Sequence, residues 1–311
     1  MQDRINILIA DSIDLSNIKI LDKKRFSVNI KLGIANSEIL QSRISYNALI
    51  IRSTRIIDKA ILSRCGLDLV ATCSKGVDHI DVDYAKKKGI KIINCISGNH
   101  ISAAEHTLGL ILEIYKRISY SDALIRQGNF SIIDFERREL AGKKIGIIGV
   151  GKVGSHVAKL SEAFGLKIFA NDIDKEARIK TSHLQFKSLI YILKHCDIIA
   201  LHIPIDKKNY NFISKDKLDL ISEKSIFINT SRGRIINEKH LTRLLKRKRI
   251  AFAGLDVFYN EPDINKEFFK LENVILTNHS AGKTIESRNR IAKDILMQVR
   301  NFYINFGKRT K

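Results

Sequence analysis

Three segments in the later part of the chain place polar residues directly after an apolar, β-branched run. They are INTSRGRIIN with Arg232, GLDVFYNEP with Asp256 and Glu261, and ILTNHSAGKT with His279. An arginine can hold a carboxylate by two hydrogen bonds, and a histidine can move a proton near neutral pH. A carboxylate can orient that histidine and keep it cationic. Taken singly, each residue also has an ordinary structural explanation, such as a surface ion pair, so their role depends on what lies around them.

A glycine-rich segment in the middle of the chain is typical of a dinucleotide site. The pattern G-x-G-x-x-G follows an apolar run and precedes an amphipathic helical pattern, which is the context that this otherwise weak pattern needs. The first glycine permits a tight turn, the second lets the backbone approach a pyrophosphate, and the third lets helix and strand pack closely. The residues predicted to contact the cofactor here are Gly149, Gly151, Lys152, Val153, Gly154 and Asp172.

Asp172 favours one cofactor over another. It ends the next predicted strand, where a carboxylate can accept hydrogen bonds from both ribose hydroxyls and would repel a 2′-phosphate. NAD is therefore expected rather than NADP. The alternative to a dinucleotide site as such is a glycine turn with a purely structural role. Together with NAD, an arginine, a histidine and a carboxylate describe the oxidation of a hydroxy acid.

Short apolar runs alternate with longer helical patterns along the chain. The predicted strands are INILIAD, YNALIIRS, DLVATCS, IKIINC, KIGIIGVG, LKIFAND, DIIALHI, SIFINTS, IAFAGLD and NVILTNH. Strands separated by helices imply parallel sheets built from βαβ units, so the predicted class is α/β. A long helix is predicted from Ser102 to about Arg117, with Ser102 and Glu105 as a capping box at its start. Four predicted strands precede this helix and six follow it, so we expect two sheets.

Composition excludes several classes of protein. Among the 311 residues no apolar run approaches the ~18 residues that a membrane-spanning helix needs, so no membrane span is expected. The N-terminal segment lacks the features of a signal peptide, which predicts a cytoplasmic location. Cys65, Cys73, Cys95 and Cys196 lack the paired spacing of a metal site, so free thiols and no metal are expected.

The chain is strongly basic, with 54 Lys and Arg against 33 Asp and Glu and a net charge of +21. Such a surface attracts polyanions in general, although lysines spread over solvated helix faces are the simpler interpretation. The densest cluster, Lys246 to Arg249, follows an apolar helical pattern, where cations are favourable without any ligand. Trp is absent and no basic-aromatic interleaving is visible, which argues against nucleic-acid binding.

The order of motifs along the chain resembles the D-isomer-specific 2-hydroxyacid dehydrogenases, and most closely the D-3-phosphoglycerate dehydrogenases among them. The resemblance covers nearly the whole chain. Its motifs are Arg52-Ser53, SKGVDHID, GNHISAAEHT, the glycine turn, LHIP, TSRGRIIN, GLDVF with the following EP, and TNHSAG.

This resemblance implies a fold of two Rossmann-like or flavodoxin-like parallel-sheet domains. Residues 1–98 with 285–311 would form a discontinuous substrate-binding domain, and residues 99–284 the NAD-binding domain, with the active site in the cleft between them. It also implies a homodimer formed through the NAD domain by the helix that starts near Ser102. With 311 residues, the short form without a regulatory domain is expected.

The resemblance assigns roles to individual residues. Arg232 would hold the substrate carboxylate and polarise the reacting oxygen, His279 would exchange the proton, and Glu261 would act on His279. Asp256 would hydrogen-bond the nicotinamide carboxamide. Other cofactor contacts are expected from Pro204, Thr230, Ser231 and Gly282. Substrate contacts are expected from Arg52, Ser53, Lys75, Gly76, Val77 and Asn99.

Several substrates stay open at this point. Arg52 falls where phosphoglycerate dehydrogenases carry a phosphate-facing arginine, so 3-phosphoglycerate, the entry to serine biosynthesis, is favoured. Glyoxylate, hydroxypyruvate, pyruvate and erythronate 4-phosphate are alternatives. Two departures from the family pattern are Asn278, in place of a proline before His279, and Asn237, in place of a common aspartate. An alternative of another class is an NAD-sensing scaffold similar to the corepressors of this family, which keep the same catalytic residues.

Overall fold

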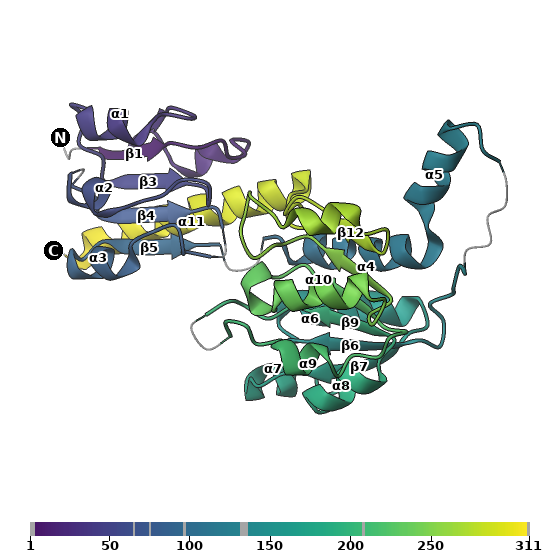
Figure 1. The fold of residues 1–311 in the computed structure, drawn as a ribbon. Coiled ribbons are helices and arrows are strands. Elements are labelled where there is room, and N and C mark those ends of the chain that lie inside the picture. The colour runs from purple at the N-terminus through teal and green to yellow at the C-terminus, as the bar shows by residue number, and fades with distance from the viewer. Residues whose placement is uncertain are drawn as a thin grey trace. The chain divides into compact units, whose positions relative to one another are not determined.

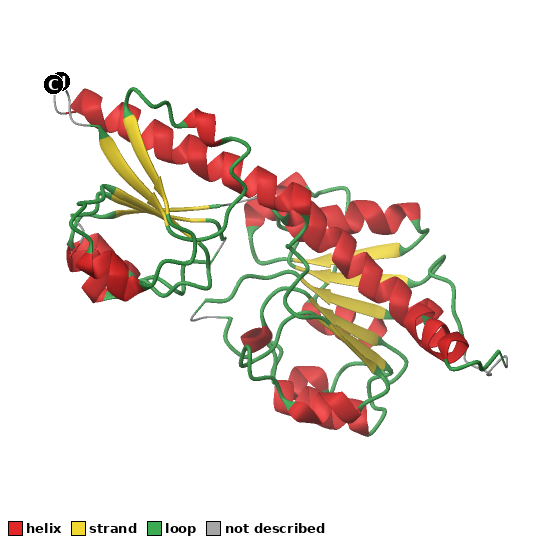
Figure 2. Cartoon of the chain, turned by 90° about the horizontal axis from the view of Figure 1, so that it is seen from above, coloured by secondary structure: helices red, strands yellow, loops and turns green. Residues whose placement is uncertain are grey.

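The structure is a computed structural model that describes residues 4–64, 66–74, 76–95, 98–130, 136–206 and 209–309. It divides into two compact units, one formed by residues 1–99 with 283–311 and the other by residues 100–282. Each unit contains one parallel sheet with helices on both of its faces, as Figure 2 shows.

The first unit contains a five-stranded sheet. Its strands are β1 (Ile5–Ile9), β2 (Phe26–Ile30), β3 (Ala48–Ile51), β4 (Leu69–Thr72) and β5 (Lys91–Asn94). Its helices are η1 (Ile18–Ile20), α1 (Asn36–Gln41), α2 (Lys59–Arg64), α3 (Val82–Lys87) and α11 (Ile285–Arg309). All strand pairs are parallel and the order is β2-β1-β3-β4-β5, which is the flavodoxin-like order.

Apolar residues on both sides of these strands explain why helices cover both faces. Successive side chains of a strand point to opposite faces, so Leu8 packs with the short helices α1 to α3. Ile7 and Ile9 pack with Ile295 and Val299 of α11. Figure 1 shows α11 lying along the sheet, and its contacts with β4 and β5 agree. The C-terminal helix thus completes the core that the N-terminal residues begin.

The second unit contains a seven-stranded sheet. Its strands are β6 (Lys144–Ile148), β7 (Lys167–Asn171), β8 (Gln185–Phe186), β9 (Ile198–Leu201), β10 (Ile226–Asn229), β11 (Phe252–Leu255) and β12 (Val274–Leu276). Its helices are α4 (His100–Lys116), α5 (Ile118–Arg126), α6 (Lys152–Ala163), α7 (Lys175–Lys180), α8 (Leu189–His195), α9 (Lys215–Leu218), η2 (Gly233–Ile235), α10 (Glu238–Lys246) and η3 (Lys266–Lys270).

The strand order β12-β11-β10-β9-β6-β7-β8 is that of a Rossmann sheet extended by one strand. The chain direction of the crossovers reverses between β6 and β9, and ligands of open α/β sheets bind at such a switch point. Helices α4 and α6 cover one face, where they pack against Ile198 of β9. Helices α8, α9 and α10 cover the other face, where they pack against Ile199. The carboxyl ends of β6 and β9 are therefore the expected ligand edge.

Two details differ from the sequence prediction. The four strands expected before the long helix and the six expected after it omit β2 and β8, each of which lies at one edge of its sheet. The predicted capping box is also wrong, because α4 begins at His100 and Ser102 lies buried inside the helix. Polar residues interrupt FSVNI, and QF has only two residues, so both strands carried a weak sequence signal.

Other expectations concern the surface and the thiols. In the described ranges, no helix combines the length and the apolar character needed to cross a membrane. Cys73, Cys95 and Cys196 are free thiols, whereas Cys65 lies outside the described residues. In the basic cluster at the end of α10, Lys246 pairs with Glu267 and Arg249 with Glu223 at the surface.

Candidate active site

Three neighbouring strands of the second unit end at the same register position, and a polar residue directly follows each of them. The pairing Asn229↔Leu255↔Leu276 places the next residues, Thr230, Asp256 and Thr277, side by side at the carboxyl edge. The candidate catalytic residues lie on the loops that begin here. Parallel register thus brings together segments that lie far apart in the sequence.

Asp256 is the anchor of the loop that carries His279. Its buried carboxylate accepts hydrogen bonds from the Thr277 hydroxyl at 2.6 Å, the Ser280 N–H at 2.8 Å and the Ala281 N–H at 3.0 Å. Its carbonyl accepts from the His279 N–H at 2.9 Å. The resemblance implied that Asp256 hydrogen-bonds the nicotinamide carboxamide, whereas the hydrogen bonds that its carboxylate accepts in the structure come from this loop. A carboxylate has room for a further donor, so the contact with the cofactor stays a prediction.

His279 and Glu261 form a hydrogen-bonded pair. The His279 Nδ1 lies 2.6 Å from the Glu261 Oε2, and both side chains are partly exposed. His279 has a φ of 53°, in the left-handed region that non-glycine residues adopt only when their surroundings hold them there. The Asp256 bonds supply that constraint. The structure thus brings together the histidine and the carboxylate that the sequence nominated.

Glu261 is held from a second side. Its Oε1 accepts a hydrogen bond from the Phe258 N–H at 2.9 Å, so the two oxygens are committed to different groups. Burial raises the pKa of the Glu261 carboxyl. The hydrogen bonds from His279 and Phe258 and the positive charges of His279 and Arg232 outweigh burial, so this pKa lies below its usual value. Glu261 is therefore a carboxylate at neutral pH.

Arg232 approaches this pair because the backbone around it is tightly packed. A Cβ on Gly233 would lie 1.9 Å from the Phe258 carbonyl, so only glycine lets the two loops meet. One Arg232 nitrogen donates to the Ser231 carbonyl at 2.7 Å. Within the described ranges the Nε and the other terminal nitrogen donate to no protein group, which leaves a fork suited to a carboxylate.

Two positioning residues were not nominated from the sequence. Asn229 is fully buried, and its amide accepts from the Ser231 N–H and hydroxyl and donates to the Arg232 carbonyl. Glu238 accepts from the Tyr259 N–H at 2.7 Å in the loop that carries Glu261. An asparagine at the end of the apolar run IFIN was the available signal for the first. No sequence signal pointed to Glu238, because an acidic residue at the start of a helix is common.

Glu238 differs from its neighbour Glu261 in its ionisation. Burial raises the pKa of the Glu238 carboxyl, and the negative charge of Glu261 raises it further, against the hydrogen bond from Tyr259. Glu238 at the start of α10 and Glu261 on the loop that it contacts therefore have pKa values displaced in opposite directions.

The glycine turn follows β6, and each glycine has a distinct environment. Gly149 has a φ of 93°, which favours glycine. A Cβ on Gly154 would lie 1.9 Å from the Gly149 oxygen, so helix α6 packs directly on the turn. A Cβ on Gly151 would meet nothing within 4 Å, so open space lies beside its backbone. Gly151 also precedes α6 without a side-chain cap, and the first N–H groups of that helix, from Lys152 and Val153 onward, are available to an anion.

Asp172 braces this turn from the end of β7. Its Oδ2 accepts from the Val150 N–H at 2.7 Å and its Oδ1 from the Asp174 N–H at 2.8 Å. Each oxygen keeps a lone pair for a ribose hydroxyl. These acceptors, the open backbone at Gly151 and the uncapped helix start fit a dinucleotide.

The other predicted cofactor residues lie on strand ends of the same sheet. Pro204 is exposed and lies three residues after the end of β9, and its carbonyl accepts a hydrogen bond from the Asn209 side chain. Thr230 and Ser231 follow β10, and Gly282 lies in the turn after the His279 loop. No cluster of three or more His, Cys, Asp or Glu side chains that could hold a metal is found within the described ranges.

The predicted substrate residues lie in the first unit. Arg52 and Ser53 follow β3, Gly76 and Val77 follow β4, and Asn99 lies in the turn before α4. The Arg52 N–H donates to the Asp11 carboxylate at 2.9 Å, while its guanidinium makes no hydrogen bond or ion pair to described residues. The N–H groups of Gly76 and Val77 likewise donate to no group in the described part of the chain. Lys75 lies outside the described residues.

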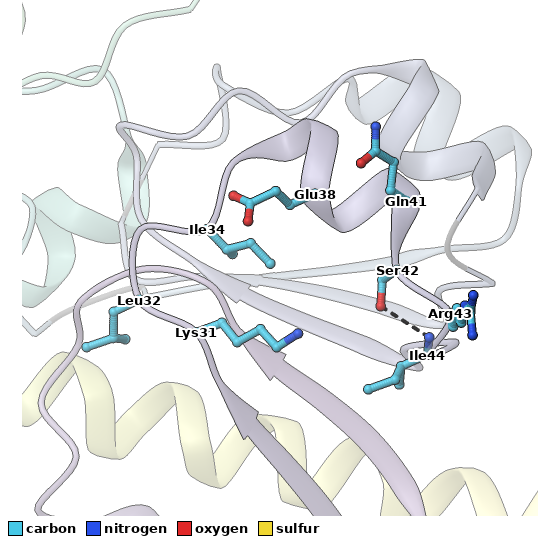
Figure 3. A pocket seen from close by; sticks show the side chains of 8 residues that line it. All are labelled: Lys31, Leu32, Ile34, Glu38, Gln41, Ser42, Arg43 and Ile44. Carbon is cyan, nitrogen blue, oxygen red and sulfur yellow. Dashed lines mark hydrogen bonds between the residues drawn. The ribbon is translucent and has the colours of Figure 1, made fainter.

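A surface hollow of about 600 Å³ lies elsewhere in the first unit, beside α1. Figure 3 shows its lining, where the Ser42 hydroxyl accepts a hydrogen bond from the Ile44 N–H. None of the predicted site residues lines it. The candidate active site is therefore defined by strand ends rather than by this hollow.

Comparison with known proteins agrees with the geometry of the second unit. The sequence model of the D-isomer specific 2-hydroxyacid dehydrogenase, NAD binding domain, matches residues 108–281. A D-3-phosphoglycerate dehydrogenase of Synechocystis sp. is 32% identical over 306 residues, which cover 98% of this chain and 55% of that protein. A glyoxylate reductase of Thermococcus litoralis is 35% identical over 259 residues, which cover 79% of this chain and 77% of that protein.

The fold is also found in solved structures. A D-lactate dehydrogenase from Aquifex aeolicus, crystallised with NAD and lactic acid, matches with a TM-score of 0.81 and 29% identity over 96% of both chains. The present chain spans about half the length of the phosphoglycerate dehydrogenases that it matches, 55% and 57% of the first two.

Proposed function

Since the chain belongs to the D-isomer-specific 2-hydroxyacid dehydrogenase family, we propose that it interconverts a D-2-hydroxy acid and the corresponding 2-keto acid with NAD as cofactor. The observation that carries this proposal is the 2.6 Å pair between His279 Nδ1 and Glu261 Oε2, with the charge of Arg232 acting on Glu261. A proton carrier, its carboxylate partner and a carboxylate-binding cation are the groups that this reaction needs from the protein.

In this proposal each side chain has a task. His279 donates its Nδ1 proton to Glu261, which leaves Nε2 to take the hydroxyl proton during oxidation and to return it during reduction. Glu261 stabilises the imidazolium that forms, because it is ionised and its other oxygen is fixed by Phe258. Arg232 binds the substrate carboxylate through the nitrogens that the protein leaves unused.

The residues of the glycine turn would hold the cofactor, which supplies the hydride acceptor or donor when bound. The N–H groups at the start of α6 would bind its pyrophosphate. The Asp172 carboxylate would accept hydrogen bonds from its ribose hydroxyls. Gly151 leaves the space that the pyrophosphate needs.

For the substrate we favour 3-phosphoglycerate, oxidised to 3-phosphohydroxypyruvate. The Arg52 guanidinium makes no bond to described residues and is available to a phosphate. The N–H groups of Gly76 and Val77 offer donors to a carboxylate. Phosphoglycerate dehydrogenases are among the most similar relatives, but so are glyoxylate reductases, so an unphosphorylated keto acid is the alternative.

We also propose that the protein dimerises through its second unit, with α5, which directly follows α4 in the chain, as part of the interface expected at α4. Helix α5 buries none of its residues, and Figure 1 shows it standing away from the seven-stranded sheet. Ile118 and Ile125 on this helix are more than half exposed, as is Phe130 beyond it. Ile125→Asp should shift the sedimentation coefficient toward that of a monomer without weakening NADH binding.

The test of the catalytic proposal is a steady-state assay that follows NADH absorbance. The panel is 3-phosphoglycerate with NAD, and hydroxypyruvate, glyoxylate, pyruvate and 2-oxoglutarate with NADH. Turnover of one of these acids that falls by at least ~100-fold in His279→Ala supports the proposal. His183→Ala, which changes an exposed histidine of the same unit, is the matched control. Measurable NADH binding without turnover of any acid would instead favour an NAD-sensing scaffold.

A further inference from the structure

Two neighbouring residues of α4 contact the strand ends that carry the candidate active site. The His106 Nε2 lies 3.0 Å from the Thr277 hydroxyl, and the Thr107 hydroxyl lies 2.9 Å from the Thr230 hydroxyl. Helix α4 packs along β10, β11 and β12, and the contacts with Thr277 and Thr230 place these two residues at the carboxyl edge. Neither His106 nor Thr107 has a role in the reaction described above.

The direction of the hydrogen bonds at Thr277 follows from donor counting. A threonine hydroxyl has one proton, and Thr277 donates it to the Asp256 carboxylate at 2.6 Å. Toward His106 the same hydroxyl can therefore only accept. His106 must carry its proton on Nε2, which also lies 3.6 Å from the Asp256 Oδ1. The chain of donors thus runs from His106 through Thr277 to Asp256.

The same reasoning fixes the direction at Thr107. Its hydroxyl donates to the Ala103 carbonyl of α4 at 2.8 Å, so the proton between Thr107 and Thr230 comes from Thr230. The Thr230 side chain can consequently offer a bound ligand only an acceptor. One turn of α4 therefore holds the first residue after β10 and the first residue after β12.

The anchoring of Thr277 matters because His279 follows two residues later in a left-handed conformation. Such a conformation persists only when several contacts fix it, and a misplacement of about 1 Å in a catalytic group can cost roughly 100-fold in rate. Asp256 holds the loop from the side of the sheet, and His106 orients the hydroxyl that bonds to Asp256.

We propose that His106 is a positioning residue, which acts through Thr277 and Asp256 to keep His279 in place for proton transfer. This inference rests on the proposed function of His279. The donor chain makes two predictions that a general structural role does not make. The effects of changing His106 and Thr277 must overlap, and they must fall on kcat rather than on KM.

The experiment compares His106→Leu, Thr277→Val and the double variant in the full chain. Each single change is expected to lower kcat by about 10- to 100-fold, with KM and the Kd of NADH within about threefold of the unchanged protein. The double variant is expected to equal the worse single variant, because both break the same chain of bonds. His106→Gln and Thr277→Ser keep a donor and a hydroxyl and should restore most of kcat, and His183→Leu serves as the control.

Two kinetic outcomes would overturn the inference. Multiplied losses in the double variant would mean that His106 and Thr277 act independently. A rise in KM alone for His106→Leu would make His106 a substrate-binding group instead.

Amide exchange separates this inference from the proposed function. The Ser280 and Ala281 N–H groups donate to Asp256, so hydrogen-deuterium exchange over residues 277–284 reports the anchoring without any turnover. Faster exchange is expected in His106→Leu and Thr277→Val, and unchanged exchange in His183→Leu. If no acid is turned over but exchange rises as expected, the anchoring stands and the catalytic role fails. If exchange does not change, the anchoring itself is wrong.

Discussion

At the strand ends of the seven-stranded sheet, the groups expected to react are bonded to other protein groups, as His279 is to Glu261. At the strand ends of the five-stranded sheet, the groups expected to bind are without partners in the described ranges, as the Arg52 guanidinium is. There the protein fixes the backbone instead, since Asp11 holds the Arg52 N–H and pairs with Arg55 at 2.7 Å.

This difference indicates a division of tasks. Groups that must act on a reacting atom are oriented before any ligand arrives, which removes the cost of ordering them during the reaction. Groups that must capture a charged substituent keep their hydrogen-bonding capacity and gain partners only from the ligand. Changes to the pre-oriented pair His279 and Glu261 in the second unit should therefore alter kcat, and changes to the binding groups of the first unit should alter KM.

The largest effect is expected from removing the negative charge of Glu261, which is hydrogen-bonded to His279. Glu261→Gln keeps an acceptor for the Nδ1 proton but cannot stabilise the imidazolium, so kcat should fall by about 100-fold with little change in KM. Glu267→Gln, on the surface of the same unit, is the control. An unchanged kcat would show that the pair is only structural.

The same variant should change how stability depends on pH. The pKa of Glu261 is lowered in the folded protein, so its contribution to stability is present above the usual carboxyl pKa and is lost as pH falls through the lowered value. Thermal melts between neutral and acidic pH should show a smaller loss for Glu261→Gln than for the unchanged protein.

A smaller effect is expected from the open arginine of the first unit. Arg52→Ala removes charge-assisted hydrogen bonds of about 2 kcal/mol, which corresponds to roughly a 30-fold higher KM for 3-phosphoglycerate. Its kcat and thermal stability should change little. Arg43→Ala, an exposed arginine of the same unit, is the control. An equal rise in KM for glyoxylate would contradict a phosphate-binding role.

Two glycines of the turn sharpen the comparison within the second unit. Gly151→Ala places a methyl in open space, so the melting temperature should hold while the Kd of NADH rises by about tenfold, or ~1.4 kcal/mol. Gly154→Ala forces a methyl against the Gly149 carbonyl and should lower both stability and binding. Titration by fluorescence and thermal melts would distinguish the two. A stable Gly154→Ala protein with normal binding would refute the packing argument.

The smallest effect is expected at Glu238, whose pKa is raised by burial in the folded protein. Its contribution to stability is present below the usual carboxyl pKa and is lost as pH rises through the raised value. Glu238→Gln should therefore melt about 2–4 °C higher than the unchanged protein at alkaline pH, with a smaller difference at acidic pH. The sign is opposite to that at Glu261, and a gap that shrinks as pH rises would falsify this assignment.

The sequence predicted much of this organisation, for identifiable reasons. Strands buried on both faces are apolar throughout, so the inner strands were found. The edge strands β5 and β12 were found too, while the polar-interrupted β2 and the two-residue β8 were not. The start of α4 was misjudged because Ser102 and Glu105 fit a capping pattern although Ser102 is buried inside the helix.

The candidate site shows the same limit. Arg232, Glu261 and His279 could be nominated because their chemistry is evident from residue type. The anchoring by Asp256 and Asn229 could not, because it depends on which backbone N–H groups the register places within reach. Sequence reasoning found the groups that act and missed most of the groups that hold them.

Strands β10, β11 and β12 end at the same register position, which limits where residues can be inserted or deleted in this protein. Side chains alternate between the two faces of a strand, so losing one residue within β11 would turn Asp256 to the opposite face and detach the Thr277–Ala281 loop from it. The loops beyond the strand ends have no such alternation of faces to preserve. Insertions in those loops therefore leave the register intact, while the lengths of these three strands must stay as they are.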